Sequence, residues 1–297
     1  MDIGKIGEFG LINRIKKHIR ADATVVKGIG DDCAVIRSGP GKLQLYTCDM
    51  IVEGVDFTAR DSRELAGRKA LAVCVSDIAA CGGVPRYALV SLGLPSRTQV
   101  KEVDNIYKGL NSVAREFGIN IVGGDISKAP KLAIDVSLIG ETRPEDLILR
   151  SGAKKGDIIF VTGSFGGSLR GKHLNFTPRL KESRYLTGHF KINSMIDVSD
   201  GLAQDLGHIL EASKAGAVIY EDLVPQSPFS GGIKSALCDG EDFELVFTLS
   251  LKESRRLRKT GRPFTAIGEI VPGKYGLTMV DSNIRRKKIK FRGFNHF

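Results

Sequence analysis

The sequence predicts a mixed α/β (α+β) protein built from two domains. Three observations support this prediction: short apolar strands alternate with helical segments, a polar break that contains a proline lies near the middle of the chain, and 297 residues suit two domains of ordinary size. The break covers residues 141–146. We therefore expect one domain over residues 1–145 and a second domain over residues 146–297.

The first half contains two strand patterns and one unusual helix. Residues 42–49 and residues 131–140 alternate apolar and polar side chains, as strands with one buried face do. Residues 65–82 are rich in alanine and other small residues and are apolar on almost every side. This pattern is typical of a buried helix that other backbone approaches closely. We also expect the strand at residues 131–140 to be an edge strand, which would expose unpaired backbone groups unless a second copy covers it.

The second half begins with a strand at residues 157–163, which runs into a glycine-rich loop at residues 163–171. Apolar, β-branched and aromatic residues then recur in further strand patterns. These patterns lie at residues 217–220, 244–249 and 265–270. The second half is therefore expected to be α/β as well.

A loop followed by an amphipathic helix is expected over residues 197–217. Leu202, Leu206, Ile209 and Leu210 recur at the spacing of one helical face. Ser199 is placed to cap the start of this helix, because a serine oxygen can accept a hydrogen bond from a free N–H group of the first turn.

The composition favours a soluble protein of a reducing compartment. No stretch approaches the ~20 apolar residues of a membrane helix, and the N-terminus lacks the basic and apolar regions of a signal peptide. The cysteines are odd in number and contain no CxxC pair, so the sequence indicates neither a zinc ribbon nor a disulfide framework. They are Cys33, Cys48, Cys74, Cys81 and Cys238. We expect a cytoplasmic protein with no membrane partner.

The net charge is +10, from 44 Lys and Arg against 34 Asp and Glu. Such an excess suggests nucleic-acid binding first. However, the chain has no tryptophan, and basic residues interleave with aromatic ones only at residues 290–297. The densest basic run, residues 285–288, favours a solvated face around a late strand, with a small anionic ligand as the next alternative. Nucleic acid is not the partner we expect.

Acidic residues stand beside glycine at several predicted strand ends. A single Asp-Gly pair usually marks a turn, but Asp77 lies inside the apolar helix, where a carboxylate is costly unless it is paired or bound to metal. Carboxylates on several loops can converge on hard divalent cations, which take oxygen ligands. The acidic residues of these motifs are Asp32, Asp49, Asp77, Asp125, Asp197, Asp200, Glu241 and Asp242.

Other signatures of phosphate chemistry are missing. The chain has no GxxxxGK[ST] loop, and in GIGDDC, residues 28–33, Cys33 replaces the third glycine of a dinucleotide fingerprint. Many aspartates without a phosphate loop fit phosphate chemistry that uses several Mg²⁺ ions. Cys74, Asp77 and Cys81 share a helical face that could hold a thiolate metal, but buried packing of the two cysteines is the favoured interpretation.

The motifs together resemble thiamine-monophosphate kinases, in order along nearly the whole chain. The matching segments are 7–12, 28–35, 49–57, 69–82, 122–125, 150–157, 196–209 and 240–245, with the terminal FRGFNHF. That family belongs to the superfamily of phosphoribosylaminoimidazole synthetase, selenophosphate synthetase and a hydrogenase maturation factor. The resemblance implies the two-domain aminoimidazole-ribonucleotide-synthetase-like fold, with N-terminal sheets that pair in a homodimer.

The resemblance also implies an activity and a set of site residues. It implies ATP-dependent, Mg²⁺-requiring conversion of thiamine phosphate to thiamine diphosphate, with thiamine phosphate and ATP as partners. Catalysis through metal would involve Asp77, Asp125 and Asp197. The implied ligands of several Mg²⁺ ions are Asp32, Thr47, Cys48, Asp49, Asp77, Asp125, Asp197 and Asp200. The implied nucleotide-binding residues are Gly124, Asp125, Arg150 and Ser199, and the implied substrate-binding residues are Asp56, Glu241 and Phe291.

The chain departs from the family pattern at three positions. Cys48 stands where threonine is usual, Cys74 where asparagine is usual, and Asp56 where a histidine usually meets the substrate. Two alternatives therefore stay open: another ATP-using member of the superfamily, or a catalytically weakened nucleotide-binding relative. The kinase reaction needs no dedicated base, because its nucleophile is a phosphate oxygen that is largely ionised near neutral pH; neutralising charge is the main task.

Overall fold

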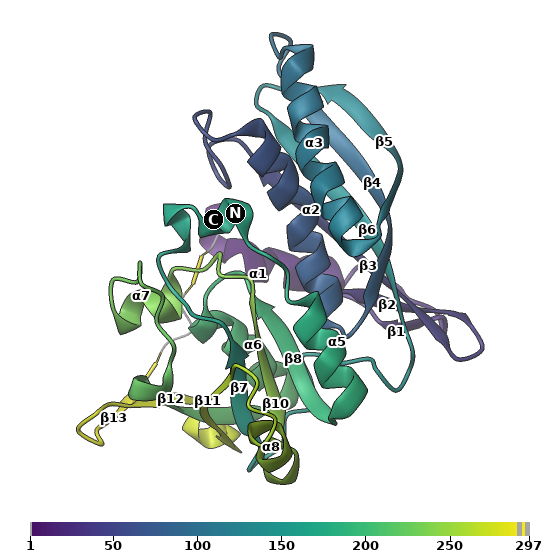
Figure 1. Cartoon of the computed structure of the whole chain (residues 1–297). Helices are drawn as coiled ribbons and strands as arrows, with labels where there is room; N and C mark the ends of the chain where they lie inside the picture. The colour runs from purple at the N-terminus through teal and green to yellow at the C-terminus, as the bar shows by residue number, and fades with distance from the viewer. Residues whose placement is uncertain (1, 290–292, 295–297) are drawn as a thin grey trace.

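The computed structural model describes residues 2–289 and 293–294, and it contains two sheets with helices packed against them (Figure 1). The mixed α/β class predicted from the sequence is confirmed. The first sheet uses strands from residues 25–142, and the second uses strands from residues 158–288. The division into domains at residues 145 and 146 stays a prediction, which this separation of the sheets supports.

The first sheet has six strands in the order β1-β2-β3-β6-β4-β5. Only the β4–β5 pair is parallel. The strands are β1 (Val25–Lys27), β2 (Ala34–Gly39), β3 (Lys42–Val52), β4 (Val84–Leu94), β5 (Asn120–Lys128) and β6 (Ala133–Thr142). The predicted strands at residues 42–49 and 131–140 are confirmed. The edge position predicted for the second of them is wrong, because β6 pairs with β3 on one side and with β4 on the other. The two edge strands are β1 and β5, and β5 is exposed along almost its whole length.

Two helices, α2 (Arg63–Ala80) and α3 (Val100–Phe117), cover one face of this sheet (Figure 1). Helix α2 confirms the predicted buried helix, since most of its side chains from Ala66 onward are buried. Its small residues allow close packing on α3. A Cβ added to Gly67 would lie 2.0 Å from the Ile106 carbonyl oxygen, and one added to Gly109 would lie 1.8 Å from the Glu64 carbonyl oxygen. Larger residues at these two glycines would push the helices apart.

The second sheet has seven strands in the order β13-β12-β9-β11-β7-β10-β8. Its strands are β7 (Ile158–Thr162), β8 (Ile192–Val198), β9 (Ala215–Tyr220), β10 (Glu244–Leu249), β11 (Phe264–Pro272), β12 (Leu277–Val280) and β13 (Arg286–Lys288). The helices of this half are α4 (Lys172–Asn175), α5 (Leu180–His189), α6 (Leu202–Ser213), α7 (Ile233–Cys238) and α8 (Leu251–Arg258). All four strand patterns predicted in this half are confirmed. The basic run lies on exposed β13, as the solvated-face interpretation predicted.

Helix α6 shows both a correct prediction and an error. The four predicted apolar residues, Leu202 to Leu210, are all buried. The predicted Ser199 cap is wrong, because the N-cap residue is Gly201. The side chain of Asp205 accepts hydrogen bonds from the backbone N–H groups of Asp200 and Gly201, each at 3.0 Å. A carboxylate in the first turn thus holds the backbone just before the helix, while no side chain caps the first turn itself.

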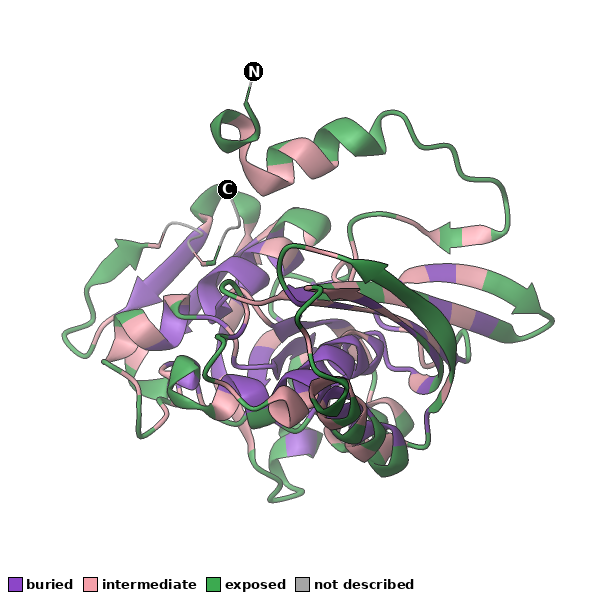
Figure 2. Cartoon of the chain, turned by 90° about the horizontal axis from the view of Figure 1, so that it is seen from above, coloured by how far each residue is buried: buried purple, intermediate pink, exposed green. Residues whose placement is uncertain are grey.

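The N-terminal helix α1 (Ile3–Lys16) has no buried residue and bends at Gly7 (Figure 2). Its Phe9 ring contacts the ring of His208 on α6, with centroids 5.0 Å apart. The start of the chain therefore packs against the second half. None of the helices in the described ranges is both long and apolar enough to span a membrane.

Candidate active site

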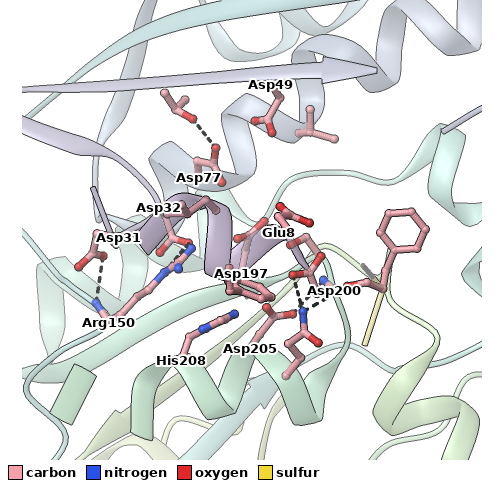
Figure 3. Close-up of a pocket in the computed structure, with 18 of the residues that line it drawn as sticks. Glu8, Asp31, Asp32, Asp49, Asp77, Arg150, Asp197, Asp200, Asp205 and His208 are labelled. Atoms are coloured by element: carbon pink, nitrogen blue, oxygen red, sulfur yellow. Dashed lines mark hydrogen bonds and ion pairs between the residues drawn. The ribbon is translucent and has the colours of Figure 1, made fainter. Parts of the chain in front are cut away.

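A cavity of about 900 Å³ lies where the two halves meet, and most of the predicted site residues line it (Figure 3). Both halves contribute to its wall, together with α1. The lining acidic residues are Glu8, Asp31, Asp32, Asp49, Asp56, Asp77, Asp197, Asp200, Asp205, Glu211 and Glu241. Its lining cations are Lys69, Arg150 and, when protonated, His208. A cavity with so many carboxylates fits ligands that bring positive charge.

Asp32, Asp77 and Asp197 form the centre of the cavity wall, and we call them the cavity carboxylates. One oxygen from each lies within 4.8 Å of the others. Three elements distant in the sequence bring them together: the loop before β2, the helix α2 and the end of β8. Asp77 accepts a hydrogen bond of 2.5 Å from the Thr47 hydroxyl, and Asp197 accepts one of 2.5 Å from the Ser76 hydroxyl.

Burial and mutual repulsion disfavour ionisation of the cavity carboxylates. Burial is the main cause that raises the pKa of Asp197 to about 8, and the charge of Asp32 adds to it. Burial also raises the pKa of Asp77 well above its usual range, with further repulsion from Asp49 and Asp197. Three ionised carboxylates this close are costly unless a cation stands between them.

Arg150 is the protein cation nearest to these carboxylates. Its guanidinium donates to Asp32 Oδ1 through Nη2 at 2.7 Å and through Nε at 3.2 Å. The other oxygen, Asp32 Oδ2, is buried and has no hydrogen-bond partner in the described part of the chain. Asp31, which the sequence interpretation did not select, holds the Arg150 backbone N–H at 3.1 Å and forms an ion pair with Lys27. The sequence feature that could have identified Asp31 was its position next to Asp32.

The strand β3 carries Thr47, Cys48 and Asp49 to the cavity. Burial raises the pKa of Asp49. The Cys74 thiol lies 3.6 Å from Asp49 Oδ2 and 3.2 Å from the Val136 carbonyl oxygen, so this residue packs in the core beside the site. Cys48 is exposed. A thiolate site on the face of Cys74 and Cys81 does not form: the acidic neighbours of Cys81 are Asp31 and Asp32, in a different group.

A second group at the cavity combines Asp200 with two residues that the sequence interpretation missed, Asp205 and His208 (Figure 3). One ligand atom of each lies within 4.8 Å of the others. The Gln204 amide donates to Asp200 at 2.9 Å. Burial lowers the pKa of His208 to about 4, so its ring is neutral near neutral pH. Asp205 could have been found as an acidic residue in the first turn of the helix, whereas nothing in the sequence marked His208.

The predicted substrate side of the cavity contains Asp56 and Glu241, together with a further residue, Lys69. The Asp56 carboxylate accepts a hydrogen bond of 2.7 Å from the Val52 backbone N–H, which closes its own turn. Lys69 is 1% exposed, and its ammonium donates to Glu241 Oε2 at 2.5 Å. Sequence reasoning missed Lys69, although a lysine within an alanine-rich helix was a signal.

Some predicted site residues are not brought to this cavity. Gly124 and Asp125 lie on the exposed edge strand β5, and neither belongs to the cavity lining. Asp125 accepts a hydrogen bond from the Ser127 hydroxyl at 3.1 Å. Ser199, the other predicted nucleotide-binding residue of this set, does line the cavity. Phe291 falls outside the described residues. The roles assigned to all of these residues stay predictions.

Comparison with known protein families supports the predicted fold. Residues 30–142 match the family model described as AIR synthase related protein, N-terminal domain. The thiamine-monophosphate kinase of Rhodopirellula baltica is 37% identical over 293 residues, which cover 92% of each chain. The thiamine-monophosphate kinase of Bacillus subtilis is 35% identical over 323 residues, with 98% of this chain and 99% of the relative covered.

A solved structure agrees with these sequence matches. The protein AaThiL, complexed with AMPPCP and TMP, superposes with a TM-score of 0.89 at 32% identity. The match covers 100% of this chain and 99% of that one. The aminoimidazole-ribonucleotide-synthetase-like fold implied by the sequence motifs is therefore confirmed.

Proposed function

This chain belongs to the thiamine-monophosphate kinase family, and from that premise we propose that it transfers the γ-phosphoryl group of ATP directly to the phosphate of thiamine phosphate, giving ADP and thiamine diphosphate in the cytoplasm. The cavity between the two halves is the proposed active site. AMPPCP is an ATP analogue, and the AaThiL complex thus contains an analogue of one substrate together with TMP. The enzyme acts in thiamine diphosphate biosynthesis.

The cluster of cavity carboxylates carries this proposal. Asp32, Asp77 and Asp197 offer hard oxygen ligands within 4.8 Å of one another, and Asp32 Oδ2 is buried without a hydrogen-bond donor in the described chain. This donor set fits Mg²⁺, which prefers carboxylates together with substrate phosphates. Bound Mg²⁺ would neutralise charge on the ATP phosphates. Further proposed ligands are Thr47, Cys48, Asp49 and Asp200, which line the cavity, and Asp125, which lies outside its lining on β5.

The residues of the chain contribute positioning and fixed charge. Arg150 holds Asp32 by two hydrogen bonds, which fixes this carboxylate on the cavity wall. Thr47 and Ser76 orient Asp77 and Asp197 in the same way. The acceptor phosphate needs no general base, because it is already largely ionised near neutral pH, so alignment of donor and acceptor in line is the remaining task. We assign nucleotide binding to Arg150 and Ser199, which line the cavity, and to Gly124 and Asp125, which lie outside its lining on β5.

We assign binding of thiamine phosphate to Asp56, Glu241 and Phe291. The first two line the cavity, where Lys69 contacts both of them. A carboxylate there suits the cationic thiazolium ring of the acceptor better than its phosphate, because opposite charges attract in a partly buried site. Asp56 stands where the family usually has histidine, so this position offers the acceptor a carboxylate instead of an imidazole.

Assembly as a twofold dimer through the first sheet is also proposed. Strand β5 is exposed along almost its whole length, and the large apolar side chains of Val122 and Ile126 are 60% and 65% exposed. A long exposed edge strand of this kind needs a partner strand or another cover. Pairing at β5 would also place Gly124 and Asp125 at a subunit boundary. Light scattering at micromolar concentration tests this, and a particle of single-chain mass contradicts it.

One assay tests the activity directly. Purified protein is incubated with ATP, Mg²⁺ and thiamine phosphate, and ADP and thiamine diphosphate are quantified together. Equal amounts of the two products are expected, with none when EDTA replaces Mg²⁺. Thermal stabilisation by ATP without any product would favour a nucleotide-binding protein without catalysis and would contradict the proposal.

A further inference from the structure

Lys69 is a buried cation that joins the two halves of the molecule at the substrate side of the cavity. It lies on α2, and its side chain is 1% exposed. The ammonium donates to Glu241 Oε2 at 2.5 Å and to the Asp56 carbonyl oxygen at 3.0 Å. Lys69, Asp56 and Glu241 all line the cavity. A lysine is rarely buried so fully without a task that offsets the loss of its hydration.

The Glu241 backbone adopts a conformation that few side chains accept. Glu241 has φ of 59° and Phe243 has φ of 49°, and Gly240 before them has φ of 71°. Two non-glycine residues in the left-handed region within one turn store backbone strain. Strain of this kind persists only where surrounding contacts hold the backbone in place.

Contacts from both sides hold this turn. The Glu241 backbone N–H donates to the Ser199 carbonyl oxygen at 2.6 Å, and that of Phe243 donates to the Val198 carbonyl oxygen at 2.8 Å. The Phe243 ring stacks on the ring of Phe176, with centroids 4.0 Å apart. These contacts fix the backbone and the neighbouring ring, but none of them fixes the Glu241 carboxylate.

The Glu241 side chain depends on Lys69 for its direction. Its Oε2 accepts the hydrogen bond from the ammonium, while Oε1 accepts none from the residues that the structure describes. Burial raises the pKa of Glu241, and the ammonium of Lys69 opposes this shift. The neighbouring Arg68 strengthens the same junction, because it donates to the Phe176 carbonyl oxygen at 3.0 Å.

From this geometry we infer that Lys69 is a positioning residue for the acceptor: it aims Glu241 and the turn around Asp56 at the thiamine moiety and so sets the affinity for thiamine phosphate, but not for ATP. The inference rests on the proposed function. Lys69 itself stays bound to Glu241 and to the Asp56 carbonyl group, and it takes no part in phosphoryl transfer. The class of ligand that this pair selects is a cationic heterocycle that carries a phosphate.

A purely structural lysine would give a different result, because its loss would weaken the fold or lower kcat without favouring one substrate. The distinguishing quantity is therefore the ratio of the two KM values. Lys69→Met removes the charge at nearly constant volume. The matched control is Lys108→Met. Lys108 lies on the adjoining helix α3 and forms an exposed ion pair with Glu64 of α2.

Steady-state kinetics of the full chain then test the inference, with each substrate varied in turn. Lys69→Met is expected to raise the KM for thiamine phosphate at least about tenfold, as the loss of one charge-assisted hydrogen bond at the binding site would. The KM for ATP should stay within about twofold of the wild-type value, since a tenfold change would need a further 1.4 kcal/mol. Lys108→Met should leave both values unchanged.

A double-mutant comparison covers the possibility that Lys69→Met does not fold because it leaves Glu241 buried and unpaired. Glu241→Gln and the double variant Lys69→Met/Glu241→Gln leave no unpaired buried carboxylate at this position. If Lys69 acts through Glu241, the double variant loses much less thiamine-phosphate affinity than the product of the two single losses. Independent losses that multiply would overturn the inference, as would equal changes in both KM values. Wild-type protein that forms no thiamine diphosphate would instead overturn the proposed function, and the inference with it.

Discussion

The molecule contains two groups of buried carboxylates, one drawn from both halves and one from the second half alone, and their partners differ. The cavity carboxylates are Asp32, Asp77 and Asp197. The guanidinium of Arg150 lies beside them, but among these three carboxylates it donates a hydrogen bond only to Asp32. The other group is a pair outside the cavity lining, Asp242 and Glu244, whose hydrogen bonds all come from the protein. We call these two residues the anchored carboxylates. Glu244 accepts hydrogen bonds from Arg179 at 2.6 and 2.7 Å and from Lys172 at 3.0 Å.

The pKa values separate the two groups as well. Burial acts to raise the pKa of Glu244, but the hydrogen bonds and charges of Arg179 and Lys172 lower it below its usual value. In Asp197 burial and repulsion act together and raise the pKa to about 8. Asp242 is intermediate: burial still raises its pKa, because Lys172 is 3.9 Å away and its closer donors are the neutral groups of Gly166 and Ser168. Carboxylates that the protein neutralises maintain the fold, whereas those left unneutralised are available to ligand cations.

The largest expected effect follows from changing a cavity carboxylate. Asp77→Asn should lower turnover by at least about 10²-fold, the usual loss when one transition-state electrostatic contact is removed. The fold should remain, because the amide keeps the size of the carboxylate and removes repulsion from Asp49 and Asp197. Raising the Mg²⁺ concentration should restore little. Coupled measurement of ADP release and urea unfolding checks both statements.

The matched control for this variant is Asp104→Asn, which changes an exposed aspartate on the adjacent helix α3. It should behave as wild type in both measurements. Near-normal turnover of Asp77→Asn would remove Asp77 from the catalytic site. Loss of the folded state would mean that Asp77 belongs with the anchored carboxylates.

An anchored carboxylate should give the reverse result. Glu244→Gln removes the charge that Arg179 and Lys172 surround, and we expect the free energy of unfolding to fall by about 2 kcal/mol, the scale of a buried hydrogen bond to a charged group. Activity per folded molecule should fall much less than in Asp77→Asn. Urea unfolding followed by circular dichroism measures the difference.

Glu269→Gln provides the comparison on the same sheet. Glu269 is half-buried on β11, and no salt bridge of the described residues includes it. Its replacement should change the free energy of unfolding by a few tenths of a kcal/mol at most, as surface changes generally do. If Glu244→Gln proves no more destabilising than this control, the proposed contrast between the two groups is wrong.

The cavity carboxylates also predict how stability depends on pH. Because the folded-state pKa of Asp197 is about 8, the folded state binds more protons than the unfolded state between the usual aspartate pKa near 4 and pH 8. Stability should therefore fall as the pH rises from 6.5 to 8 in EDTA, by about 1 kcal/mol. His208 has the opposite effect on stability. Its pKa is lowered to about 4 in the folded state, so it makes stability rise with pH, but mainly between pH 4 and its unfolded pKa near 6.5.

Urea unfolding at pH 6.5, 7.2 and 8, each with EDTA or with Mg²⁺, checks this prediction. The stabilisation by Mg²⁺ should grow with pH, because the cation replaces protons that the carboxylates would otherwise keep. Asp197→Asn should flatten the dependence in EDTA. A stability that rises with pH over this window in EDTA would contradict the assigned shift.

The contrast explains how much of the site could be predicted from the sequence. Asp32, Asp49, Asp77 and Asp197 were found because each stands beside glycine at a strand end or inside an apolar helix. The sequence does not reveal that Glu244 is neutralised by the protein whereas these aspartates are not. The cations that neutralise Glu244, Arg179 and Lys172, are 65 and 72 residues away from it along the chain. The predicted elements were correct where the apolar pattern was periodic. The position of residues 131–140 within the sheet was wrong, because a strand pattern does not reveal its neighbours.

The smallest expected effect concerns Asp56, which fits neither group. Its carboxylate accepts one backbone N–H, from Val52, and its carbonyl oxygen accepts the Lys69 ammonium. Asp56→Ala should raise the KM for thiamine phosphate several-fold, about 1 kcal/mol, and leave the KM for ATP nearly unchanged. Asp56→Asn can still accept from Val52, so it separates loss of the turn from loss of the charge.

The Mg²⁺ dependence of the Asp56→Ala defect decides between two roles for the charge. If Asp56 acts through a cation that bridges to the acceptor phosphate, the defect should shrink as Mg²⁺ rises; if it faces the thiazolium ring, the defect should be independent of Mg²⁺. Equal behaviour of Asp56→Asn and wild type would assign the residue to its turn alone. Unaltered kinetics in both variants would show that this position no longer contacts the acceptor, and would leave the pair of Lys69 and Glu241 to orient it.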